Sequence, residues 1–121
     1  MAQRHYGGLL TAPSTAASLR SLLISAGFLT AAANPAPNPF YRTLVIRLRT
    51  GSGPVYFGRN NGANADGTAT TNLTNAGVGA TGSIDTTLPS FAVDCHGGAA
   101  SADNFFIAGN ASDTIQVDLH E

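Results

Sequence analysis

The sequence predicts an all-β fold, a small antiparallel β-sandwich or jelly-roll-like barrel preceded by an N-terminal arm with one short helix. Three observations lead to this prediction. Hydrophobic residues recur at every second position in several short runs after residue 40, which is the period of a half-buried strand. Turn-forming residues such as Gly, Asn and Pro separate these runs. The chain has 121 residues, which fits one domain of ordinary size.

The N-terminal arm is expected to span residues 1–40. Residues 1–13 lack clear periodicity, so an irregular segment is predicted there. A helix follows over about residues 15–26, because apolar residues recur at helical spacing between a polar capping residue and Gly27. Such a helix is too short to persist alone in water, so its leucine stripe must dock on the body of the protein or on a neighbouring subunit. Alternating prolines in residues 31–39 then predict an extended, semi-rigid spacer.

The sandwich domain is expected to span residues 41–121, and its first two strands are predicted to form a hairpin. In residues 41–50, apolar side chains alternate with arginine and other outward-facing residues, which describes a half-buried strand. A Gly-Ser-Gly-Pro turn then leads into a second strand that starts at residues 55–57. Residues 58–83 are rich in Gly, Asn, Ala and Thr and predict a long loop, with one weak strand near residues 68–73.

Three further strands are predicted in the last third of the chain. They cover residues 91–96, 104–108 and 114–119, and turn residues at 109–113 predict a hairpin between the last two. The side chains that should meet in the core come from all of these strands. They are Leu44, Ile46, Leu48, Val55, Phe57, Phe91, Val93, Phe105 or Phe106, Ile107, Ile115, Val117 and Leu119.

The sequence is poor in charge, and its charges are separated by sign. Charged residues make up 11% of the chain, against roughly 25% in typical soluble domains. All six basic residues are arginines before residue 60, and all seven acidic residues follow it. This composition indicates a surface partly covered by other subunits, or else one made of uncharged Ser, Thr, Asn and Gly. No nucleic-acid partner is expected at a net charge of −1, and no membrane partner in the absence of a long apolar stretch.

Two pairs of residues carry side chains that could support chemistry. Cys95 and His96 are neighbours on a predicted strand, so their side chains should point to opposite faces. Asp118 and His120 share a strand face, but a metal site needs three or four converging ligands, and no third ligand is visible in the sequence. No phosphate-binding loop, dinucleotide fingerprint or paired-histidine metal motif is present. We therefore expect no enzyme activity, no cofactor and no metal.

Two groups of residues are candidates for binding a protein partner. The leucine stripe of the helix is apolar, although such a stripe more often packs on the protein's own core. Arg47 and Arg49 lie on one face of a predicted strand, where they face either solvent or the carboxylates of a partner. The predicted partner-binding residues are Leu19, Arg20, Leu22, Leu23, Arg47 and Arg49. The proline-rich spacer favours an interlocking role for the helix, because it lets the helix reach away from its own domain.

Four short segments carry a resemblance to a known family. They are Leu-Val-Ile-Arg-Leu at 44–48, Gly-Pro-Val-Tyr-Phe-Gly at 53–58, Phe-Phe-Ile-Ala-Gly at 105–109 and Ala-Ser-Asp-Thr-Ile-Gln-Val at 111–117. Over about the last 80 residues, the sequence resembles small β-sandwich virion proteins of tailed bacteriophages. The resemblance implies a capsid decoration or cement protein, often trimeric, and in some cases a tail or fibre part.

These observations together predict a viral structural protein that binds the lattice of major capsid proteins and stabilises the head. Its expected partners are the major capsid protein and other copies of itself, in a homotrimer. Its expected place is the outer surface of the capsid, after synthesis in the host cytoplasm. Two alternatives remain. One is a tail, neck or fibre component; the other is a carbohydrate-binding module, which would need an exposed aromatic platform from a chain that has three tyrosines and no tryptophan.

Overall fold

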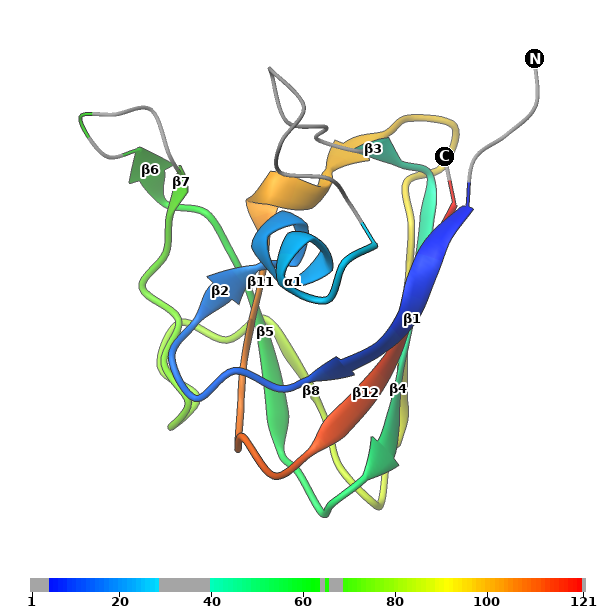
Figure 1. Cartoon of the computed structure of the whole chain (residues 1–121). Coiled ribbons are helices and arrows are strands. Elements are labelled where there is room, and N and C mark those ends of the chain that lie inside the picture. Colours follow the sequence, from blue (N-terminus) through cyan, green and yellow to red (C-terminus); the bar gives the residue numbers. More distant parts are fainter. Residues whose placement is uncertain (1–4, 29–39, 64, 66–68, 121) are drawn as a thin grey trace.

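The computed structural model describes residues 5–28, 40–63, 65 and 69–120, and it confirms the predicted all-β fold. Within these residues, two four-stranded antiparallel sheets pack face to face (Figure 1). Sheet A has the order β1 (His5–Thr11), β12 (Thr114–His120), β4 (Thr43–Thr50) and β9 (Ser90–Asp94). Sheet B has the order β2 (Ala17–Ser18), β11 (Phe105–Ala108), β5 (Val55–Arg59) and β8 (Gly82–Ile84).

The pairing of these strands is nested from the ends of the chain to its middle. The first strand pairs with the last (β1 with β12), the second with the last but one (β2 with β11), and then β4 pairs with β9 and β5 with β8. Such a set of pairs is one long hairpin folded over on itself, which is the topology of an eight-stranded jelly roll. The jelly-roll form of the prediction is therefore the one that the structure adopts.

The two predicted hairpins are wrong. β4 lies in sheet A and β5 in sheet B, so the turn at residues 51–54 carries the chain from one sheet to the other. The turn at residues 109–113 does the same between β11 and β12. Turn residues indicate that the chain reverses, but they do not specify which strand becomes the hydrogen-bonded partner. Here the apolar sides of consecutive strands face each other across the core.

The irregular segment predicted for residues 1–13 is also wrong, because β1 pairs with β12 along its whole length. The register runs from His5 opposite His120 to Thr11 opposite Thr114. The alternation that marks a strand is hidden here, since the core-facing position 8 is a glycine. A Cβ atom at Gly8 would overlap with the ring of Phe28, which occupies that space instead.

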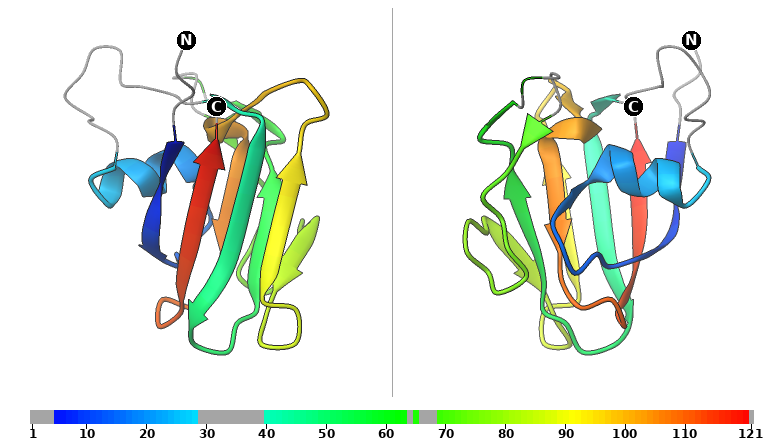
Figure 2. Two further views of the ribbon diagram at one scale, coloured as in Figure 1. Left: turned by 90° about the vertical axis from the view of Figure 1, so that its right-hand side faces the viewer. Right: turned by 60° about the vertical axis from the view of Figure 1, so that its left-hand side comes forward.

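The helix α1 (Leu19–Ser25) is shorter than predicted and lies across the open side of the sandwich. Its start is later because residues 17–18 pair with β11, and Ser18 then accepts a hydrogen bond from the N–H of Ser21 at 3.1 Å. Its predicted end is confirmed. Gly27 has a φ of +85°, and the N–H of Phe28 donates to the carbonyl of Leu23 at 2.9 Å. The helix contacts β1, β2 and β11, so it closes the gap between the edges of the two sheets (Figure 2, right).

Small elements complete both ends of the sandwich. They are β3 (Phe40–Tyr41) paired with β10 (Ala100–Ser101), the 3-10 helix η1 (Ala102–Asn104), and β6 (Gly62–Ala63) paired with β7 (Ala69–Thr70). The weak strand predicted near residues 68–73 corresponds to β7. The predicted proline-rich spacer lies outside the described residues. No helix in the described part of the chain is long and apolar enough to cross a membrane.

The main core lies between the sheets, and a second apolar cluster lies outside sheet B. Most of the predicted core residues are buried, and Leu48, Phe91 and Val93 are half-buried against them. Phe105 belongs to the main core, whereas Phe106 points the other way into the second cluster. Residues 69–80 cover that cluster by placing Leu73 over the outer side of sheet B. Sheet B is thus apolar on both faces.

Candidate interaction surfaces

Sheet A has one face in the core and one face that no described segment covers. Figure 2 (left) shows this second face toward the viewer, with all four strands side by side. We call it the outer face of sheet A. Its side chains follow from the register of the strands, because directly opposite residues of an antiparallel pair share a face. They are Gly7, Leu9 and Thr11; Thr114, Gln116, Asp118 and His120; Thr43, Val45 and Arg47; and Ser90, Ala92 and Asp94. Arg49 follows Arg47 at an irregularity in the register and is exposed beside this face.

The charges on the outer face of sheet A are separated by sign along the strands. Arg47 and Arg49 lie toward the end of β4, and both are exposed. Asp118 lies one row away from Arg47 in the other direction, and Asp94 lies one row further, opposite Thr43. The rows of Arg47 and Asp94 are four residues apart, which is about 13 Å in a strand. The separation of charge along the sequence therefore reappears across a single face of the molecule.

The predicted outward direction of the two strand arginines is confirmed, and their binding to a partner stays a prediction. On the same face, Leu9 is 57% exposed, Ala92 is exposed and Val45 is half-buried. Val45 and Ala92 are direct neighbours in one row, which also holds Asp118, and Leu9 lies on the edge strand in the row of Arg47. A protein partner could bury these apolar side chains and bind the arginines through bidentate hydrogen bonds.

The leucines of the α1 stripe differ in how deeply they are buried. Leu19 and Leu23 are fully buried in the core of the chain itself, so their side chains have no surface left for a partner. Leu22 is half-buried and lines a groove, and Arg20 is half-buried beside the stripe. In the structure the helix docks on the body of its own chain, where it covers the gap between β1 and β2.

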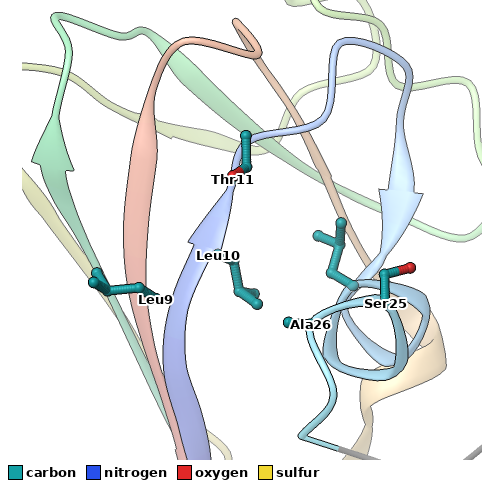
Figure 3. Close-up of a pocket in the computed structure, with 6 residues that line it drawn as sticks. Leu9, Leu10, Thr11, Ser25 and Ala26 are labelled. Atoms are coloured by element: carbon teal, nitrogen blue, oxygen red, sulfur yellow. The ribbon is translucent and has the colours of Figure 1, made fainter.

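A groove of about 380 Å³ runs between β1 and α1. Leu9, Leu10 and Thr11 line one side, and Leu22, Ser25 and Ala26 line the other. Figure 3 shows Leu10 directed toward the helix and Leu9 directed away from it. Leu9 therefore belongs both to the groove and to the outer face of sheet A, which makes the two surfaces continuous. Of this groove, the sequence showed only the adjacent leucines Leu9 and Leu10. The groove itself depends on the packing of α1 beside β1, which the sequence did not predict.

The residues considered for chemistry lie apart from these surfaces or on their edge. The half-buried thiol of Cys95 donates to the backbone carbonyl of Tyr41 at 3.5 Å. His96 lies in the exposed turn after β9, with a φ of +50°. Asp118 and His120 share the outer face of sheet A, as expected from their spacing. Among the described residues, no three His, Cys, Asp or Glu side chains come together as metal ligands.

Comparison with known proteins gives no relative for this chain. No family model, no curated protein and no solved structure matches it. The resemblance to virion proteins of tailed phages therefore stays a prediction from the four short segments. The site has to be interpreted from its own geometry.

Proposed function

We propose that this chain is a viral structural protein, a capsid decoration or cement protein that binds the lattice of major capsid proteins. The observation that carries the proposal is the outer face of sheet A, which is four strands wide, combines small, apolar and charged side chains, and is uncovered by the described part of the chain. Surfaces of this kind are typical of proteins that work among other subunits. The jelly-roll topology is compatible with this function, because viral capsid proteins use it, as lectins and cupins also do.

In this role, the outer face of sheet A lies against the outer surface of the capsid. Arg47 and Arg49 bind carboxylates of the capsid protein, since the planar guanidinium group is suited to bidentate contacts at an interface. Leu9, Val45 and Ala92 supply apolar surface to the contact. A homotrimer would repeat each weak contact three times on a symmetric shell and so bind with high avidity. The head would then be stabilised by cross-linking of neighbouring capsid subunits.

The two alternatives differ in how well the side chains fit them. A tail, neck or fibre component could use the same face against another partner. A carbohydrate-binding module fits less well, because Tyr41 is 5% exposed and Tyr56 is half-buried, so neither ring offers a flat exposed platform. No feature of the described residues favours a tail over a head position.

Labelling of virus particles tests the proposal. Antibodies against the purified chain, visualised with colloidal gold, should decorate the head shell of particles from the source of the chain. Purified protein should also cosediment with heads from which it has been stripped. Label confined to the tail would replace the head function with a tail function. Absence of the protein from the particles, or specific binding of the purified chain to a glycan array, would contradict a function in the virion.

A further inference from the structure

A second concave site lies at the end of the sandwich where β5 ends and β11 begins. Its volume is about 360 Å³, within the range of about 300–1,000 Å³ that is usual for small-molecule sites. Tyr41, Arg59, Asn60, Phe91, Asn104 and Phe105 are among the residues that line it. We call it the end cavity. It lies apart from the outer face of sheet A, because its walls come from the space between the two sheets.

The floor of the end cavity is aromatic. Phe57, Phe91 and Phe105 form a cluster in which the ring centroid of Phe57 lies 4.8 Å from that of Phe91 and 5.5 Å from that of Phe105. Phe91 is half-buried, and Phe91 and Phe105 both line the cavity. An apolar body can therefore stack on ring surface that the protein itself leaves partly uncovered.

Two of the side chains that line this cavity, Arg59 and Tyr41, are hydrogen-bond donors. Arg59 lies directly opposite Phe105 in the register of β5 and β11, so its side chain leaves the sheet on the core side, over the cavity. In the described residues no ion pair is found for Arg59, and no hydrogen bond is found for the hydroxyl of Tyr41. Among the described residues that line the cavity, none is acidic. A negatively charged ligand would thus meet two donors and no opposing carboxylate.

The protonation state of Tyr41 allows its hydroxyl to donate a hydrogen bond to such a ligand. Burial raises the pKa of Tyr41, the nearby thiol of Cys95 raises it further, and the positive charge of Arg59 lowers it in part. The phenol is therefore protonated at neutral pH and can donate its proton to an acceptor. Tyr41 and Arg59 both line the end cavity.

The rim of the end cavity is held in place by a contact between two segments far apart in the sequence. The side-chain amide of Asn60 donates to the side-chain oxygen Oδ1 of Asn104 at 2.9 Å. This bond ties the end of β5 to η1 and fixes the position from which Arg59 extends. A preformed site of this kind loses less conformational entropy when a ligand binds.

We propose that the end cavity binds a small organic carboxylate with an apolar body, its carboxylate held by Arg59 and Tyr41 and its body stacked on Phe91 and Phe105. A guanidinium and a phenol both donate to a carboxylate, and the charge-assisted bonds are the stronger ones. This inference goes beyond the proposed function and does not depend on it, because binding to a capsid uses a different face.

Titration of the isotope-labelled full chain with phenylacetate, 4-phenylbutyrate and butyrate, followed by NMR amide shifts, tests the proposal. Phenylacetamide is the matched neutral ligand. We expect the carboxylates to shift amides around residues 58–60 and 104–105, and to bind about tenfold more tightly than the amide, as charge-assisted bonds predict. The substitution Arg59→Gln should remove this preference and Tyr41→Phe should weaken it, while Arg47→Gln, on the outer face of sheet A, should bind like the original protein.

Several results would overturn the proposal. One is equal binding of phenylacetate and phenylacetamide by the unmodified chain, which needs no variant to fold. Another is an undiminished carboxylate preference in the folded Arg59→Gln variant. Shifts confined to other parts of the molecule, or no binding of any carboxylate up to about 10 mM, would also reject it, since an affinity weaker than that is no specific site. None of these results bears on attachment to a capsid.

Discussion

The outer faces of the two sheets are covered differently. On sheet B, residues 69–80 place Leu73 over Phe106, and both side chains are 5% exposed. On sheet A, Leu9 is 57% exposed and the neighbouring arginines are exposed as well. The segment 69–80 buries one face, and no described segment covers the other. The comparison indicates that the outer face of sheet A is the surface that a second molecule could bury, as the loop buries the outer face of sheet B.

The loop that covers sheet B, residues 69–80, is uncharged. It is held by small polar groups: Thr71 donates its hydroxyl to the carbonyl of Arg59 at 2.8 Å, and the N–H of Thr81 donates to the carbonyl of Phe57 at 2.7 Å. Gly77 lies so close to the ring of Tyr56 that an added Cβ atom would be 3.0 Å from it. The uncharged residues of this segment thus pack closely on sheet B, and contact with other subunits stays a prediction from the low charge.

Truncation of matched leucines on the two faces should give the largest difference. We expect Leu73→Ala to lower the free energy of unfolding by about 2–5 kcal/mol, because it leaves a cavity under the loop. Leu9→Ala should change it by no more than about 0.5 kcal/mol, since its side chain is largely solvated. Chemical denaturation of both variants measures this. Equal losses would mean that the outer face of sheet A is covered in solution and that the comparison is mistaken.

Alanine substitutions at two glycines distinguish close packing of the loop from backbone strain alone. Gly79 has a φ of +75°, and an added Cβ atom would lie 2.6 Å from the side-chain oxygen of Asn72. Gly97 has a φ of +89° but open space around it. Gly97→Ala should cost about 1 kcal/mol of stability from the backbone alone, and Gly79→Ala about 1–2 kcal/mol more. If the two variants unfold alike, the loop does not pack as closely as described.

Neutral substitution of Arg47 and Arg49 should leave stability unchanged. The double variant Arg47→Gln with Arg49→Gln is expected to unfold within about 0.5 kcal/mol of the original protein, because both side chains are exposed. Its cosedimentation with stripped heads should be weaker at low salt, and the difference should fade at high salt as charges are screened. Arg59→Gln removes a similar charge from the end of sheet B and serves as the control. Equal binding of both variants at all salt concentrations would reject a role for these arginines.

Much of the fold was predictable because alternation marks strands with one buried face. β12 alternates between buried and half-buried residues, and β4 begins in the same way, so both were found. β11 is a continuous run of four buried residues because the loop covers its second face. β1 was missed because glycine occupies a core-facing position, and β2 and β8 have only two and three residues. The partners of each strand could not be predicted, since turn residues do not encode them.

The candidate sites were predictable only where one element carries them. The outward direction of Arg47 and Arg49 followed from alternation along a single strand. The leucines of α1 formed a visible stripe, but the sequence could not tell that their own chain would bury them. The end cavity brings together Tyr41, Arg59 and Phe105, which are far apart in the sequence, so no local pattern announces it.

One pair of substitutions tests the central claim most directly. Ala92→Arg places a large charged side chain on the outer face of sheet A, and Ala76→Arg places the same side chain on the exposed loop over sheet B. Both positions are exposed, so both variants should unfold like the original protein. We expect Ala92→Arg to abolish cosedimentation with stripped heads and Ala76→Arg to leave it unchanged. Normal binding of folded Ala92→Arg, or loss of binding in Ala76→Arg alone, would contradict the assignment of the outer face of sheet A as the contact surface.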